Sequence, residues 1–242
     1  MHPDMKKTIA TCLFVCALLA STSVTALPIG RSNDHANYMF GKGSPDVFVV
    51  GIYGSDLSRD VNDDMGWTRE LETSRVMVYG GLDVFPWFTL FGAAGAARHT
   101  IGVSDADTSP EFEFGAVLNV LDQVIYDPQL FEDRLRVNAA ATYTLSSATW
   151  YEDWDASWNT LKFSLIASVV NDSEGEKMFA PESVVLFAGP VYSLINGDDF
   201  DQDQAFGVTG GIEVYFTDSV SMNIALEHYD TTGLSGGLHL RF

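Results

Sequence analysis

Hydrophobic and polar residues alternate along most of this chain, in segments of about ten residues that are separated by turns. In the segment Glu72–Val84, for example, Val76 and Val78 fall on one side of an extended strand, and Arg75 and Asp83 fall on the other. The assignment follows because successive side chains of a strand point to opposite faces. No convincing helical period interrupts this pattern. The sequence therefore predicts an all-β fold whose strands are apolar on one face and polar on the other.

The alternation predicts ten strands, with eight or twelve as the alternative counts. Their predicted ranges are Val47–Ser58, Glu72–Val84, Phe88–Ala97, Glu111–Leu121, Arg134–Ser146, Trp158–Val170, Glu182–Leu194, Ala205–Phe216, Ser219–Tyr229 and Thr232–Phe242. An even number is what a single-chain bacterial barrel requires when both of its ends lie on the periplasmic side.

The connections between these strands differ according to strand parity. Those after the even strands are very short or moderate, and the longest of them are Asp122–Asp133 and Asn171–Pro181. Those after the odd strands are longer or more acidic, and they contain Asp56, Asp60, Asp63, Asp64, Glu70, Asp105, Asp107, Glu152, Asp153, Asp155, Asp198, Asp199, Asp201 and Asp203. Short turns at one end and long loops at the other are typical of outer-membrane barrels. We therefore predict an antiparallel, up-and-down transmembrane β-barrel with acidic extracellular loops.

Many aromatic residues lie near the predicted strand ends. They are Trp67, Phe85, Trp87, Phe88, Trp150, Tyr151, Trp154, Trp158, Tyr215, Phe216 and Tyr229. Amphipathic rings favour the boundary between membrane and water, so this distribution predicts an aromatic belt at each rim of the barrel. The alternative is that these rings form the core of a soluble fold.

The first residues predict export from the cytoplasm. Lys6 and Lys7 precede an apolar stretch, Ile9–Ala20, and small residues suited to cleavage end at Ala26. The apolar stretch is shorter than the roughly 20 residues that a membrane-spanning helix needs. We therefore expect a signal peptide at 1–26, a polar leader at 27–46 and a barrel domain at 47–242.

Composition narrows the classes of partner. Both cysteines precede residue 27, so the expected mature chain has no disulfide. Removing two Lys and one Asp with the signal leaves 11 basic and 32 acidic residues, a net charge of about −21. Nucleic-acid binding is disfavoured because phosphate neutralisation requires the opposite charge.

The last strand carries a second, independent signal. Leu234, Leu238, Leu240 and Phe242 share its apolar face, while His239 and Arg241 lie on the other face. A strand of this kind that closes on an aromatic residue resembles the final strand of bacterial outer-membrane barrels. The resemblance implies that Leu238, Leu240 and Phe242 are recognised by the barrel-assembly machinery.

Two longer segments extend the resemblance. The segment Gly210–Asp230 with the following GLSGGLHLRF resembles the closing hairpin of opacity-protein-like and outer-membrane-protein-A-like barrels, and the Val84–Ala97 hairpin looks like an earlier turn of that family. The resemblance implies the fold, an outer-membrane location, and contact with membrane lipid and lipopolysaccharide. It implies little about activity, because such barrels serve several functions. A monomer is compatible with the sequence.

Charged residues on the polar faces of the strands predict the contents of the lumen. The candidates for ion pairs inside the barrel are Arg75, Asp83, Glu113, Arg136, Lys162, Glu213, Glu227 and Arg241. Buried charges persist when they are paired, so this mixture of signs favours a filled lumen over an ion-selective pore. The main functional prediction is a non-enzymatic structural or surface-interaction protein. The alternative is a narrow passive channel for small solutes.

Other chemistry is weaker in this sequence. Glu227, His228 and Asp230 with Asp63 and Asp64 have some likeness to the mouth of ten-stranded omptin proteases, but the expected motifs are incomplete. Asp199, Asp201 and Asp203 have the spacing with which calcium loops begin, without the Gly and Glu that should follow. No motif predicts a cofactor, a metal or a catalytic residue. A soluble periplasmic protein that binds an apolar ligand is the remaining alternative.

Overall fold

The structure is a computed structural model, and it describes residues 48–63, 66–85, 87–126, 132–150, 154–172, 181–197, 200–217 and 219–242. The predicted signal peptide and leader lie outside the described residues. No helix in this described part of the chain has the length and apolar character needed to cross a membrane.

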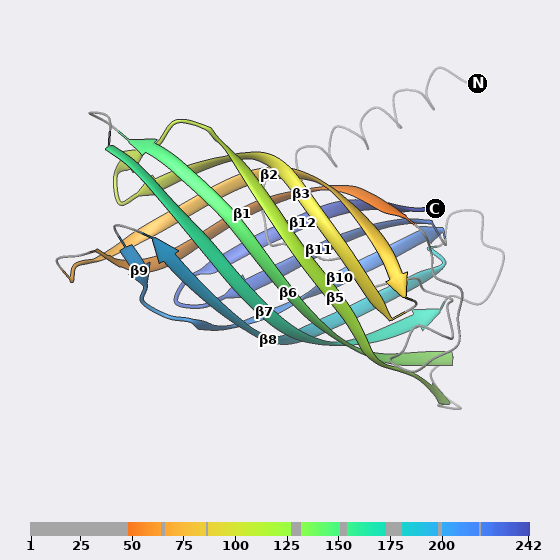
Figure 1. Ribbon diagram of the computed structural model, residues 1–242. Helices are drawn as coiled ribbons and strands as arrows, with labels where there is room; N and C mark the ends of the chain where they lie inside the picture. The colour runs from red at the N-terminus through yellow and green to blue at the C-terminus, as the bar shows by residue number, and fades with distance from the viewer. Residues whose placement is uncertain are drawn as a thin grey trace, which may run out of the picture.

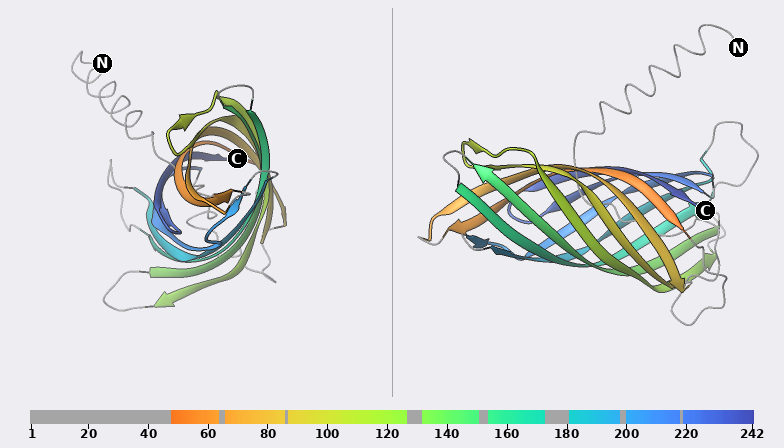
Figure 2. Two further views of the ribbon diagram at one scale, coloured as in Figure 1. Left: turned by 90° about the vertical axis from the view of Figure 1, so that its left-hand side faces the viewer. Right: turned by 45° about the horizontal axis from the view of Figure 1, so that its top comes forward.

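The described residues form one closed antiparallel barrel (Figures 1 and 2). Its strands are β1 (Val49–Asp63), β2 (Thr68–Phe85), β3 (Phe88–Ile101), β4 (Ser104–Asp105), β5 (Ser109–Tyr126), β6 (Glu132–Trp150), β7 (Trp154–Asp172), β8 (Ser183–Gly197), β9 (Phe200–Gln202), β10 (Phe206–Thr217), β11 (Val220–His228) and β12 (Thr232–Arg241). Each of the ten long strands pairs with its neighbour along the chain, and β12 pairs with β1 to close the ring. The predicted ten-stranded, up-and-down barrel is therefore confirmed.

The two ends of the barrel differ. At one end, Phe242 N donates to Phe48 O at 2.9 Å, so the start of β1 and the end of the chain lie together. We call this the terminal end, and we call the opposite end, where the label of β9 lies in Figure 1, the distal end. The strands that reach furthest toward the distal end are the β1–β2 and β6–β7 hairpins (Figure 1).

The prediction of acidic loops after the odd strands is wrong in part. Asp60, Glu70 and Asp155 lie within β1, β2 and β7, because these strands continue beyond their predicted ends toward the distal end. Asp60 pairs with Glu70 across the β1–β2 ladder, and Thr149 pairs with Asp155 across the β6–β7 ladder. The ladder is held by backbone hydrogen bonds, so outward-facing acidic side chains do not end a strand.

Fewer long strands enclose the distal end of the barrel than enclose its middle. The strands β10, β11 and β12 stop at Phe206, His228 and Thr232, and the short strand β9 crosses beyond them. It pairs with β1 at Val61–Asp63 and with β8 at Asn196. The diameter of a barrel grows with its number of strands. Replacing three strands by one therefore contracts this end. We call β9 the strap.

The side chains alternate between the lumen and the outer wall, as the sequence pattern predicts. Outward-facing Val76, Val78 and Leu82 of β2 are about half exposed, whereas inward-facing Met77 and Tyr79 are buried. The predicted rim belts are wrong for four of the aromatic residues. Trp150, Trp158, Tyr215 and Tyr229 are all buried, because their positions in the alternation point them inward.

Two glycines provide a test of how tightly this wall packs. A Cβ at Gly211 would collide with Ile224 O and would lie 2.7 Å from Phe187 Cζ, whereas a Cβ at Gly80 would meet open space. We expect Gly211→Val to destabilise the barrel by about 1–3 kcal/mol through overpacking, and Gly80→Val to have a much smaller effect. Urea titrations of tryptophan fluorescence measure the difference. Equal unfolding midpoints for both variants would contradict this account of the packing.

Candidate functional site

The lumen is the candidate functional site, because the largest set of buried charged side chains lies there. It consists of three layers. An apolar cluster fills the distal end, a charged chamber lies beneath it, and a second ionic layer lies near the terminal end. Each layer is built by the inward-facing residues of several strands.

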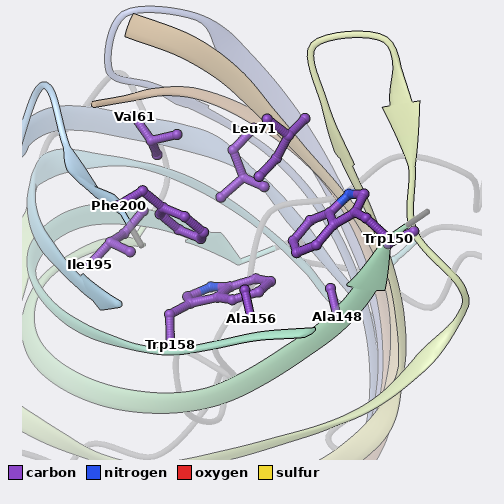
Figure 3. Packing of buried hydrophobic residues seen from close by; sticks show 10 residues of the cluster. Val61, Leu71, Ala148, Trp150, Ala156, Trp158, Ile195 and Phe200 are labelled. Carbon is purple, nitrogen blue, oxygen red and sulfur yellow. The ribbon is translucent and has the colours of Figure 1, made fainter. Parts of the chain in front are cut away.

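The distal layer, which we call the apolar cap, contains only hydrophobic side chains (Figure 3). Its members are Val61, Leu71, Ile101, Ala106, Ala148, Trp150, Ala156, Trp158, Ile195 and Phe200. The ring of Trp158 lies 5.3 Å from that of Phe200 and 6.2 Å from that of Trp150, measured between centroids. Figure 3 shows these rings pointing toward one another across the narrow end of the barrel. The cap therefore closes the distal mouth.

The chamber beneath the cap is a small polar cavity of about 60 Å³. Arg75 Nη1 lies 2.7 Å from Glu111 Oε1 and 3.8 Å from Glu113 Oε2, and all three side chains are largely buried. Across the chamber, Lys162 Nζ lies 3.5 Å from Glu227 Oε2. Hydroxyl groups complete the carboxylate contacts. Tyr53 Oη and Thr144 Oγ1 each donate to Glu113 at 3.1 Å, and Ser146 Oγ donates to Glu111 at 2.8 Å.

His99 lies at the boundary between the cap and the chamber. Its ring meets that of Trp158 edge-on at 4.6 Å, and its Nε2 lies 3.9 Å from Glu111 Oε2. Its Nδ1 is 3.1 Å from the hydroxyl of Thr73. His99 thus connects the apolar layer to the ionic layer.

The second ionic layer is centred on two aspartates. Asp122 Oδ2 accepts from Arg134 at 2.6 Å and from Arg136 at 3.1 Å, and all three side chains are at most 3% exposed. Nearby, Arg241 Nη2 lies 2.9 Å from Asp83 Oδ2.

Two further groups complete this layer. Glu213 is fully buried and accepts a hydrogen bond of 2.7 Å from Ser221. His239 Nδ1 contacts the hydroxyl of Tyr79. Glu213 therefore has a hydroxyl partner on the neighbouring strand β11, in contrast to the aspartates, which contact arginines.

Acidic and basic side chains are equal in number within each ionic layer of the described lumen. The chamber contains three cationic side chains, Arg59, Arg75 and Lys162, and three carboxylates, Glu111, Glu113 and Glu227. The second layer contains Arg134, Arg136 and Arg241 together with Asp83, Asp122 and Glu213. This neutrality places the excess negative charge of the chain outside these layers. A lumen of balanced charge has no field that selects one sign of ion.

All eight residues predicted to line the lumen are placed inside the barrel. The structure brings Arg75 to Glu113, Lys162 to Glu227, and Asp83 to Arg241, whereas Arg136 contacts Asp122 and Glu213 contacts Ser221. The sequence prediction did not single out five further acidic, basic or histidine residues of the lumen, which are Arg59, His99, Glu111, Asp122 and Arg134.

Three causes explain these omissions. Arg59 and His99 lie just beyond the predicted ends of their strands, although each continues the alternation. Glu111 and Arg134 share the inward faces of Glu113 and Arg136, so the alternation did contain their signal. Asp122 differs, because a shift of register between Asn119 and Leu121 turns it inward against the simple alternation.

The arrangement offers little support for the two chemical alternatives. Glu227 faces the lumen, whereas His228 faces outward and its Nδ1 lies 2.9 Å from the hydroxyl of Thr232. Neighbouring residues on opposite faces of a strand cannot act together on one water. Within the described ranges, no group of three His, Cys, Asp or Glu residues has the geometry to hold a metal ion.

No protein-family model matches this chain, and no curated protein matches it either.

The ionic layer gives a prediction with a matched control. Asp122→Asn removes the carboxylate that two buried guanidinium groups contact, so we expect a loss of about 3–5 kcal/mol in the free energy of unfolding. The control is Asp105→Asn, because Asp105 pairs with Arg98 at a site where both side chains are more than half exposed. We expect that change to cost at most about 1 kcal/mol. Urea titration of both variants tests the ranking, and equal losses would contradict it.

Proposed function

We propose that this protein is a non-enzymatic integral barrel of the bacterial outer membrane, with a closed lumen and a structural or surface-interaction role. The observation that carries the proposal is a reversal of polarity along single strands. Over most of its length, the barrel is apolar outside, while its inside holds the charged side chains together with apolar ones such as Met77 and Phe187. Toward the distal end, the outside becomes polar and the inside becomes apolar.

Strand β6 illustrates the reversal. Its outward-facing Tyr143 and Leu145 are about 40% exposed, while the inward-facing residue between them is Thr144. A few residues further, the outward-facing residues are Ser147 and Thr149, and the inward-facing residues are Ala148 and Trp150. A barrel surrounded by water throughout would have no reason to change its pattern midway. If the hydrocarbon layer of a membrane ends at this level, the outward-facing residues are expected to change here from apolar to polar.

The apolar outer wall extends around the barrel. Among its exposed members are Ile52, Val78, Leu82, Leu90, Phe114, Leu145, Phe163, Leu165, Leu186, Ile212, Ile224, Leu226, Leu238 and Leu240. Monomeric soluble proteins rarely expose a continuous apolar surface of this kind. In a membrane the same side chains contact acyl chains, and the closed ladder pairs most backbone groups of the described strands within the barrel.

The closed lumen favours a structural role over the alternative of a narrow passive channel. A solute that entered from the distal end would first meet the apolar cap, where Trp158 and Phe200 are both at most 6% exposed. It would then meet the two ionic layers. The soluble ligand binder is disfavoured because the apolar part of the lumen is filled by these side chains, while the cavity that remains is polar.

We propose that the distal end faces outside the cell and the terminal end faces the periplasm, and features of the two ends support this orientation and the proposed partners. Leu238, Leu240 and Phe242 of the closing strand face outward and are 44–69% exposed, so they are available to the barrel-assembly machinery. The polar outer wall of the distal end is mostly acidic. Contact with lipid and the anionic lipopolysaccharide is therefore expected through the apolar wall, because like charges repel at the distal end.

Fractionation tests the location, and conductance tests the lumen. We expect the protein to sediment with the outer membrane and to migrate differently on gels before and after heating, because a closed barrel resists detergent until it is heated. We expect planar bilayers that contain it to lack general-porin currents. Recovery in the soluble periplasmic fraction would contradict the proposed location, and sustained large currents would contradict the closed lumen.

The position of the membrane gives a further prediction. Val78 faces outward within the apolar wall and is 61% exposed, whereas Ser147 faces outward beyond it. We expect Val78→Arg to cost about 2–4 kcal/mol in lipid vesicles, because the charge would lie in hydrocarbon, and Ser147→Arg to cost at most about 1 kcal/mol. Folding titrations in vesicles measure both. Equal costs for the two variants in vesicles, or a larger cost for Ser147→Arg, would contradict the assigned position.

A further inference from the structure

The strap holds one member of the apolar cap. Its three residues pair with Val61–Asp63 of β1, and Asp201 pairs with Asn196 of β8. Just after the strap, Asp203 N donates to Asp60 O at 3.0 Å. The first residue of the strap, Phe200, is 4% exposed and packs against Trp158 (Figure 3). The strap is thus a short element whose main apolar contact closes the mouth of the barrel.

One buried guanidinium group fixes the strap to its surroundings. Arg59 on β1 is 4% exposed. Its Nη1 donates to Ser193 Oγ of β8 at 2.8 Å, and its Nη2 donates to the backbone oxygen of Gln204, just after the strap, at 2.6 Å. Arg59 therefore joins β1, β8 and the end of the strap.

The same guanidinium group also contacts the tip of the β11–β12 hairpin. It lies over the ring of Tyr229, 4.0 Å from the centroid. Burial, and then the carboxylate of Glu227, raise the pKa of the Tyr229 phenol above its ordinary value. The ring consequently stays neutral and attracts the cation through its π face.

The charged chamber lies directly beneath these groups. Arg59, Trp158 and Glu227 all line it. Two buried polar atoms that face this region, His99 Nε2 and Glu227 Oε1, accept or donate no hydrogen bond among the described residues. Buried polar groups are normally satisfied, and a polar cavity of about 60 Å³ has room for two or more waters. The chamber is therefore suited to hold water and small polar solutes.

We propose that the strap is a gate between the distal solvent and the charged chamber, with Phe200 as the closing side chain and Arg59 as the group that holds it shut. A short strand with few backbone pairings opens locally more readily than the long strands beside it. When the strap opens, Phe200 leaves Trp158, and the route to Arg75, Glu111 and Lys162 is clear. This inference uses the closed lumen of the proposed function, but it does not depend on the membrane in which the barrel lies.

Single cysteines test the gate directly, because both cysteines of the sequence, Cys12 and Cys16, lie in the predicted signal peptide and are absent from the expected mature protein. Thr142→Cys places a thiol in the chamber, where Thr142 is 3% exposed, and Ser147→Cys places one on the outer wall. The measurement is the rate of reaction with a small, charged, water-soluble methanethiosulfonate, using the full folded protein in detergent micelles. With the strap intact, we expect Thr142→Cys to react far more slowly than Ser147→Cys.

Substitutions in the strap should then open the chamber. We expect Phe200→Ala to raise the Thr142→Cys rate about a hundredfold, because it removes the main apolar contact of the strap. Arg59→Lys should raise it about tenfold, since lysine keeps the charge but lacks the planar fork that reaches Ser193 and Gln204 together. The matched control is Trp67→Ala, which removes an exposed aromatic residue outside the cap and should leave the rate unchanged.

The outcomes are separable from those of the proposed function. A fast Thr142→Cys reaction with the strap intact, or a rate that Phe200→Ala leaves unchanged, would overturn the gate. Gel migration before heating shows whether each variant keeps the closed barrel, and the Ser147→Cys rate reports its outer wall. The same labelling on intact cells tests the orientation. Acceleration by Phe200→Ala in micelles but not on cells would support the gate and contradict an extracellular distal end.

Discussion

Closure of the backbone ladder is the constraint on which the rest of this structure depends. Because β12 pairs with β1, no long strand is left with an unpaired edge. Closure also divides the side chains of every strand into an inner and an outer set. The inner set must fill a limited volume, and the outer set must match the surrounding solvent. The ion pairs, the apolar cap and the apolar outer wall are separate consequences of that division.

Neutral ionic layers are a physically reasonable way to fill such a lumen. Isolated charges would be costly to bury, and a carboxylate in contact with two guanidinium groups, as Asp122 is with Arg134 and Arg136, recovers much of that cost. A buried pair is not in itself a source of large net stability. Its effect here is to fix the alignment of nearby strands, since Arg241 of β12 must reach Asp83 of β2 past the intervening strand β1.

The sequence predicts most of the fold because the period of two is a property of each strand alone. The prediction failed where the alternation was interrupted or extended. Asp122 required knowledge of a register shift, which no local pattern reveals. The inward direction of Trp150 and Trp158 could be predicted only by knowing where the strands end. With shorter strands, both rings would lie at the rim of the barrel, in an aromatic belt. The strap has only three residues, too few for a period to be recognised.

The medium around the barrel explains both the apolar cap and the apolar outer wall. Where hydrocarbon surrounds the barrel, an apolar exterior is stable and the polar side chains pair inside. Where water surrounds it, the stable arrangement is the one found in soluble barrels, with Trp158 and Phe200 inside and carboxylates outside. For the membrane location that we propose, the level of the cap therefore follows from the level at which the strands leave the membrane. A closed mouth at this level needs an element that can span the gap beyond β10, β11 and β12, and the strap with Phe200 meets that need with three residues.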